Sequence, residues 1–74
     1  MAATLDVQGL QCLLPVLRAN RALRPLAPGE ELRVLATDPA APGDFIAFCR
    51  TTGHTLVASD EVDGVFSIVI RKTG

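Results

Sequence analysis

Aromatic residues are scarce in this sequence, which has three phenylalanines, no tryptophan and no tyrosine. It therefore has no row of aromatic side chains on which bases could stack, and its net charge of −1 gives no excess positive charge to attract phosphates. No apolar run approaches the roughly 20 residues that a transmembrane helix needs. We expect neither direct nucleic-acid contact nor insertion into a membrane.

Cysteine and histidine are also few. Cys12 and Cys49 match no CxxC or zinc spacing, and His54 alone cannot complete a metal site, so we expect no metal and no cofactor. The count alone permits a Cys12–Cys49 disulfide. The first residues, however, contain neither the basic nor the apolar segment of a secretory signal, so we expect a cytoplasmic protein with reduced thiols.

The length of 74 residues predicts one domain, residues 1–74, with no linker or repeat. A domain of this size buries only about 60% of the surface that its unfolded chain exposes, which leaves little room for a deep pocket. Such a protein is suited to present a reactive group at its surface.

The first half of the chain predicts a strand and a helix. Residues 4–8 alternate polar and apolar side chains, as a half-buried strand does. Apolar residues then recur at helical spacing from Leu13 to Arg24, with Pro15 in the first turn, where its missing N–H is not needed. Arg18 and Arg21 fall on another face of this helix, either as a basic rim for acidic partners or anions, or as an ordinary solvated face.

The middle of the chain predicts a second strand and helix. Residues 30–37 form a strand, and Asp38-Pro39 provides a carboxylate cap and a proline for a helix over about 40–52. Gly53 ends that helix. Cys49 falls on its apolar stripe, where core packing is the simpler interpretation and a resolving or second reactive thiol is the alternative.

The last third predicts a hairpin of two strands, 54–60 and 65–72, around an Asp63-Gly64 turn. The complete pattern is βαβαββ, an α+β two-layer sandwich with two helices on one face of a four-stranded mixed sheet. The last strand is the most apolar and is expected inside the sheet. The open face would carry apolar side chains that could dock a partner; they are Leu35, Val57, Val65 and Val69.

The candidate site is the segment from Gly9 to Pro15. Gly9 permits a tight turn, and Cys12 follows at the junction of strand and helix. Unpaired N–H groups and the positive end of the helix dipole favour thiolate over thiol at this junction. Because the first two strands are expected to be parallel neighbours, Asp38 should lie near Cys12, where it caps the second helix or orients the turn. A structural loop cysteine is the simpler alternative for Cys12.

Two ordered blocks of residues cover nearly the whole chain. They are Leu5-Asp6, Gly9-Leu10, Cys12 and Pro15-Val16-Leu17, then Asp38-Pro39, Asp44, Phe48-Cys49 and Gly53-His54. With these blocks the chain resembles the TusA/SirA family of small sulfur carriers. The resemblance implies the same βαβαββ fold and a persulfide carried on the cysteine of a Cys-Pro-x-Pro motif.

The resemblance also implies partners. A cysteine desulfurase or rhodanese-like protein would supply sulfur to Cys12, and a protein acceptor would receive it, in a relay such as tRNA thiolation, molybdenum cofactor assembly or sulfur oxidation. It implies a sulfurtransferase-like carrier, expected as a monomer, rather than a stand-alone multi-turnover enzyme. The alternative is a diverged interaction or regulatory module that keeps the fold without sulfur transfer.

The motif departs from the family pattern at Leu13, which stands in place of the first proline, and Ile46 replaces another proline common in the second helix. Leucine gives the backbone at position 13 more freedom and returns an N–H that could point at the Cys12 sulfur. The substitution loosens the turn but keeps the electrostatic basis for a thiolate.

Overall fold

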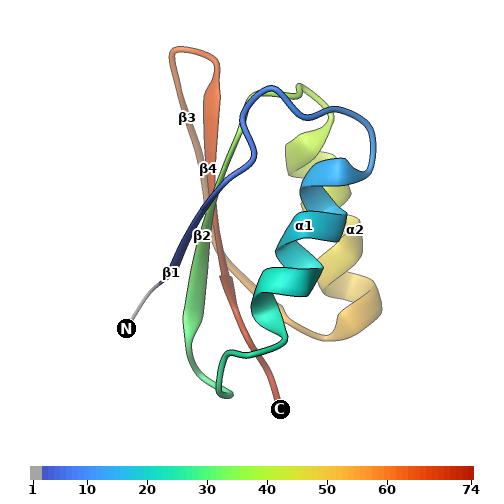
Figure 1. The fold of residues 1–74 in the computed structure, drawn as a ribbon, viewed down its shortest axis with the longest axis vertical. Coiled ribbons are helices and arrows are strands. Elements are labelled where there is room, and N and C mark those ends of the chain that lie inside the picture. The colour runs from blue at the N-terminus through green and yellow to red at the C-terminus, as the bar shows by residue number, and fades with distance from the viewer. Residues whose placement is uncertain (1–2) are drawn as a thin grey trace.

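A computed structural model describes residues 3–74 of the chain. It contains four strands and two helices in the order expected from the sequence, and both helices pack on one face of the sheet (Figure 1). The predicted domain of residues 1–74 begins two residues before the described part. The elements are β1 (Ala3–Asp6), α1 (Leu14–Leu23), β2 (Glu31–Ala36), α2 (Ala41–Thr52), β3 (Thr55–Val62) and β4 (Val65–Arg71).

The sheet is mixed and has the strand order β1-β2-β4-β3. β1 and β2 are parallel, whereas β4 is antiparallel to both β2 and β3. The most apolar strand, β4, therefore lies inside the sheet, as predicted. Since parallel strands end at the same edge of a sheet, the loop after β1 and the loop after β2 lie together at the upper end of the molecule (Figure 1).

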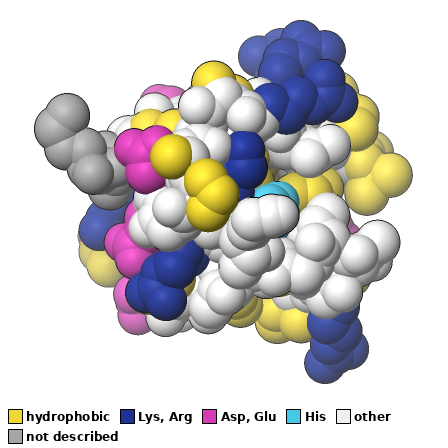
Figure 2. Space-filling model, turned by 90° about the horizontal axis from the view of Figure 1, so that it is seen from below, with side chains coloured by type: hydrophobic (Ala, Val, Ile, Leu, Met, Phe, Trp, Pro, Cys, Tyr) yellow, Lys and Arg dark blue, Asp and Glu magenta, His cyan; other side chains and the backbone are white. Residues whose placement is uncertain are grey.

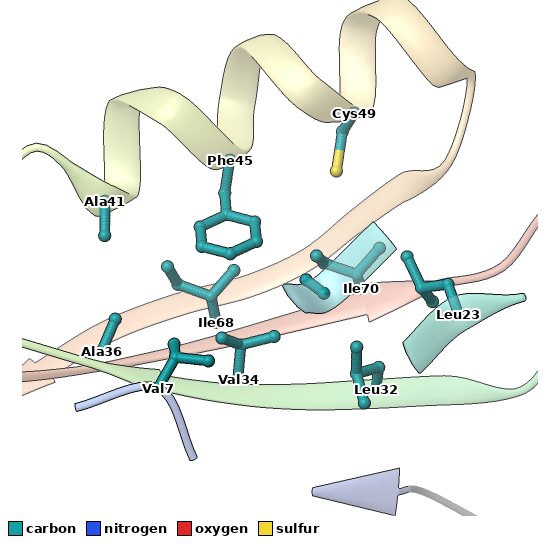
Figure 3. Packing of buried hydrophobic residues seen from close by; sticks show 11 residues of the cluster. Val7, Leu23, Leu32, Val34, Ala36, Ala41, Phe45, Cys49, Ile68 and Ile70 are labelled. Atoms are coloured by element: carbon teal, nitrogen blue, oxygen red, sulfur yellow. The ribbon is translucent and has the colours of Figure 1, made fainter. Parts of the chain in front are cut away.

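The core lies between the helices and the inner face of the sheet. Leu32, Val34 and Ala36 alternate on β2 and are buried, as the period of two predicts. Ile68 and Ile70 of β4 lie beside them, and Figure 3 shows the α2 side chains pointing down onto this layer. Phe45 and Cys49, from the predicted apolar stripe of α2, are among them, so the packing interpretation of Cys49 is confirmed.

Element boundaries differ from the predicted ones by one to a few residues. The strand predicted over 4–8 ends at Asp6, although Val7 still donates a hydrogen bond to the Leu35 carbonyl (2.8 Å). Leu13 is the N-cap of α1 and not its first residue. α2 begins at Ala41, so Asp38 is not its cap.

The open face of the sheet carries both polar and apolar side chains. Arg33 Nη1 donates a hydrogen bond to Ser67 Oγ (3.0 Å), which places polar atoms between the expected apolar side chains. β3 also shifts register between Leu56 and Ala58, so that Ala58, and not Val57, is the partner of Val69. The sequence does not reveal this bulge, because Leu56 and Val57 are both apolar and either could face inward.

Candidate functional site

The Cys12 loop, defined as residues 7–13, connects β1 to α1 and carries an exposed thiol at Cys12. Two bonds from the β2–α2 connection hold it. Gly9 N–H donates to Thr37 Oγ1 (2.8 Å), and Cys12 N–H donates to Asp38 Oδ2 (3.1 Å). The parallel pairing of β1 with β2 thus brings Asp38 to Cys12, as the sequence-based topology predicted.

Asp38 connects two parts of the site. While its Oδ2 accepts from Cys12, its Oδ1 accepts from Ala40 N–H (3.1 Å), and its carbonyl accepts from Ala41 N–H (2.9 Å). One carboxylate therefore orders both the approach to α2 and the backbone at the thiol. Of the two alternatives considered for Asp38, capping the second helix is wrong, because the N-cap of α2 is Ala40, and orienting the turn agrees with its contact to Cys12 N–H.

The backbone at Cys12 is in the left-handed region, with φ = 62°. Residues with a Cβ seldom adopt this conformation, which costs about 1–2 kcal/mol for most of them. Among the described non-glycine residues only Asp63 shares it, and Asp63 lies in a two-residue hairpin turn, where positive φ is required. Cys12 is thus in a strained conformation, and its N–H is bonded to Asp38 of the neighbouring loop, an arrangement typical of functional sites.

Leu13 and Pro15 link the Cys12 loop to α1. Pro15 is buried in the first turn of the helix, where its lack of an N–H is tolerated. Leu13 has φ = −88° at the N-cap position, and its N–H donates to no acceptor within residues 3–74. Leu13, which departs from the family pattern, therefore has an unpaired backbone N–H next to Cys12. The residue is 62% exposed.

A shallow apolar groove begins at Leu13 and runs between α1 and α2, with a volume of about 290 Å³. We refer to it as the α1–α2 groove. It joins the Cys12 loop to the exposed surface of both helices, and sequence reasoning missed it because a groove depends on how two helices pack. Its lining residues are Leu13, Val16, Asp44, Ala47, Phe48, Thr51 and Thr52.

The second thiol differs in its surroundings from the first. Cys49 is only 7% exposed and points from α2 into the core (Figure 3). Burial raises the pKa of the Cys49 thiol above its usual value of 9.0, because the interior disfavours the thiolate. Both thiols are free, so the disulfide that the cysteine count permits is absent from the structure.

The predicted basic residues Arg18 and Arg21 are exposed on α1, and Arg21 lies in the last turn, where its charge complements the helix dipole. His54 lies at the opposite end of the molecule, where Figure 2 shows the imidazole recessed in the surface. Its Nδ1 accepts a hydrogen bond from Thr73 N–H (3.2 Å), so it anchors the C-terminal segment.

Within residues 3–74, no group of three His, Cys, Asp or Glu side chains is placed to hold a metal ion. In the same part of the chain, no helix is both long enough and apolar enough to cross a membrane.

The fold and site define a class: a small two-layer α+β protein that presents one strained, exposed cysteine where a strand passes into a helix. Comparison with known families identifies that class. Residues 3–72 match the family model described as sulfurtransferase TusA. The chain belongs to the TusA family of sulfur carrier proteins.

Individual relatives agree with this assignment. A Neisseria meningitidis protein, whose name gives it a provisional sulfur carrier role, is 59% identical over 92% of this chain and 92% of its own. The sulfur carrier protein TusA of Allochromatium vinosum is 45% identical over 93% of this chain and 91% of its own. A SirA-like protein from Desulfitobacterium hafniense has a solved structure with a TM-score of 0.84 and 28% identity, over the full length of both chains.

Proposed function

We propose that this chain, as one domain of residues 1–74, accepts sulfane sulfur as a persulfide on Cys12 and passes it to an acceptor protein. The observation that carries the proposal is the left-handed backbone of Cys12, held by Asp38 on an exposed loop. Strain at a non-glycine residue persists only where surrounding contacts impose it, and here those contacts present a nucleophile. The names of the relatives support the same role.

The chemistry needs no cofactor. The Cys12 thiolate attacks the outer sulfur of a donor persulfide, a new S–S bond forms on Cys12, and the donor leaves as a thiolate with the electron pair of the broken bond. Delivery repeats this exchange with the acceptor thiolate as nucleophile, so sulfur moves without net oxidation. The free N–H of Leu13 can donate to the anionic sulfur in either step.

Each partner has a defined chemical task. The donor is a protein that carries sulfane sulfur, such as a cysteine desulfurase or a rhodanese-like enzyme. The acceptor is a protein with a reactive thiol in a relay that leads to tRNA thiolation, molybdenum cofactor assembly or sulfur oxidation. The protein acts in the cytoplasm, as a monomer that contacts proteins rather than nucleic acid.

Mass spectrometry tests the proposal directly. After incubation with a cysteine desulfurase and cysteine, or with a rhodanese and thiosulfate, the protein should gain about 32 Da for each sulfur atom bound. The gain should be lost in Cys12→Ser and retained in Cys49→Ala, because Cys49 is buried. A wild-type protein that gains no transferable sulfur from either donor system would contradict the proposal.

A further inference from the structure

A second cavity opens at the end of the molecule opposite Cys12, around the recessed imidazole of His54 (Figure 2). We refer to it as the His54 pocket. Its volume is about 200 Å³, less than the roughly 300–1,000 Å³ of pockets that hold drug-sized molecules, so it suits a small ligand. The side chains that line it come from the end of α1 and from the segments that follow α2 and β4; they are Asn20, Leu23, Arg24, His54 and Lys72.

The lining of the His54 pocket carries positive charge. Arg24 and Lys72 each contribute one full charge, and Figure 2 shows a basic side chain directly beside the imidazole. None of the lining residues, all of which lie in the described part of the chain, is acidic. Within residues 3–74 the one ion pair joins Arg71 to Glu31, so no carboxylate pairs with either cation of the pocket.

The position of Lys72 is fixed by its backbone and its side chain. Its N–H donates to the Glu30 carbonyl (2.9 Å), and its carbonyl accepts from Gly29 N–H (2.8 Å). Its Nζ donates to the Arg24 carbonyl (2.9 Å) at the C-terminal end of α1. This bond satisfies one carbonyl of the helix end but uses only one of the three N–H groups of the ammonium. Two donors therefore remain for a ligand.

His54 adds a donor whose tautomer is defined. Thr73 N–H donates to its Nδ1 (3.2 Å), so Nδ1 presents a lone pair and the neutral imidazole carries its proton on Nε2. Within residues 3–74 this Nε2–H bonds to no protein acceptor. Asn20, one helical turn before Arg24, adds an amide group to the same lining. The pocket thus combines two charges with neutral donors from three parts of the chain.

The adjacent helix ends reduce this positive charge but do not cancel it. α1 ends at Leu23 and α2 at Thr52, and a helix C-terminus carries roughly half a negative charge. Two such ends amount to about one negative charge, against the two positive charges of Arg24 and Lys72. An excess of positive charge therefore remains, so an anion that enters the pocket is attracted.

We propose that the His54 pocket binds a tetrahedral oxyanion, either free, as sulfate is, or as the phosphate group of a larger molecule. Its oxygens accept hydrogen bonds from the guanidinium of Arg24, the ammonium of Lys72 and His54 Nε2–H. Such an anion presents several acceptor oxygens and up to two negative charges, which match two cations and neutral donors better than a carboxylate does. The pocket lies at the other end of the molecule from Cys12, so binding there does not depend on sulfur transfer.

Amide NMR spectra of the complete chain, recorded during titration with sodium sulfate, test this site. Sulfate should shift the resonances of His54 and Lys72 in a saturable manner, whereas those of Gly9 and Cys12, at the opposite end, should not move. Sodium acetate at the same ionic strength should bind at least about tenfold more weakly, because it has one charge and fewer acceptor oxygens.

Adenosine monophosphate distinguishes the two sources of the oxyanion. If it shifts the same resonances with an affinity at least equal to that of sulfate, the natural ligand carries its phosphate on a larger molecule. If it binds more weakly than sulfate, the ligand is a free ion.

Two variants test the donors. Arg24→Gln and Lys72→Gln should each weaken sulfate binding about tenfold, because each loses one charge-assisted hydrogen bond. Arg24→Gln keeps the backbone carbonyl that Lys72 bonds, so the end of α1 retains this contact. Arg71→Gln is the matched control. It removes the same charge, but Arg71 follows the buried Ile70 and so points to the opposite face of the sheet, and the affinity should change by less than about twofold.

Three results would each overturn the site: no saturable shift at His54 and Lys72, equal affinities for sulfate and acetate, or sulfate binding that neither Arg24→Gln nor Lys72→Gln weakens. Thermal denaturation gives a second measurement. Sulfate stabilises folded proteins in general by strengthening apolar burial, but it should raise the Tm of the wild type more than that of Arg24→Gln, because only the intact pocket binds it well. Equal increases in Tm would also overturn the site.

Discussion

Cys12 combines an exposed thiol with a backbone conformation that suits glycine better. Replacing it with glycine removes the Cβ that makes φ = 62° unfavourable. We expect Cys12→Gly to increase the free energy of unfolding by about 1 kcal/mol while abolishing sulfur loading. Urea denaturation measures the first effect and mass spectrometry the second.

Cys12→Ala is the matched control for this prediction, because it removes the sulfur but keeps the Cβ. Its stability should remain close to that of the wild type. Equal stability of the glycine and alanine variants would show that the left-handed backbone stores no strain.

The carboxylate of Asp38 accepts hydrogen bonds from two backbone N–H groups. Asp38→Ala removes the acceptor of Cys12 N–H and that of Ala40 N–H, and should lower the free energy of unfolding by about 1–2 kcal/mol. Hydrogen exchange gives the sharper measurement: the Cys12 amide should exchange faster. Thr37→Val should instead accelerate exchange at Gly9. Unchanged protection of the Cys12 amide in Asp38→Ala would contradict the contact.

At the scale of elements, two glycines should respond in opposite directions to the same substitution. Gly64 has φ = 81° in the two-residue turn between β3 and β4, so Gly64→Ala should destabilise the fold by about 1 kcal/mol. Gly43 lies inside α2 with open space around the position of a Cβ, so Gly43→Ala should stabilise it by about 0.5–1 kcal/mol. Thermal denaturation of both variants checks the signs, and equal signs would contradict the assigned backbone.

The sequence predicts an element well where neighbouring residues in the chain determine its structure, and poorly where distant contacts do. The β3–β4 turn was predictable because Asp-Gly tolerates positive φ at both positions, and the burial of β2 because its side chains alternate. The extent of α2 was predicted to within one residue, but Asp38 was wrongly expected as its cap, because its carboxylate bonds Ala40 N–H, one residue before the helix, and also accepts from Cys12 N–H. A side chain with two tasks cannot be recognised from its neighbours in sequence.

The site was predictable in composition but not in conformation. The proximity of Cys12 and Asp38 could be predicted from the parallel order of β1 and β2. The left-handed φ of Cys12 could not be predicted, because it depends on bonds across the two loops and cysteine has no intrinsic preference for it. The α1–α2 groove likewise arises from the packing of two helices, and the sequence shows only the apolar residues that line it.

At the scale of the whole molecule, few groups titrate in the alkaline range, and the buried thiol of Cys49 is one of them. The chain has no tyrosine and a single lysine, so few groups ionise between pH 8 and 10. Cys49 is one of them, and burial raises its pKa in the folded state above 9.0. Below the unfolded pKa both states hold the proton. Above it the unfolded chain loses the proton first, so stability falls as the pH rises towards the folded pKa.

We therefore expect ionisation of Cys49 to leave the free energy of unfolding unchanged up to about pH 8.5. Above that pH, it should lower the free energy of unfolding by at most about 1.4 kcal/mol per pH unit. Urea denaturation under reducing conditions at several pH values measures it. Cys49→Ala should be less stable at neutral pH, by about 1 kcal/mol for the lost packing, yet show a shallower alkaline decrease. An equal slope in Cys49→Ala and the wild type would show that ionisation of this thiol does not limit the stability of the fold.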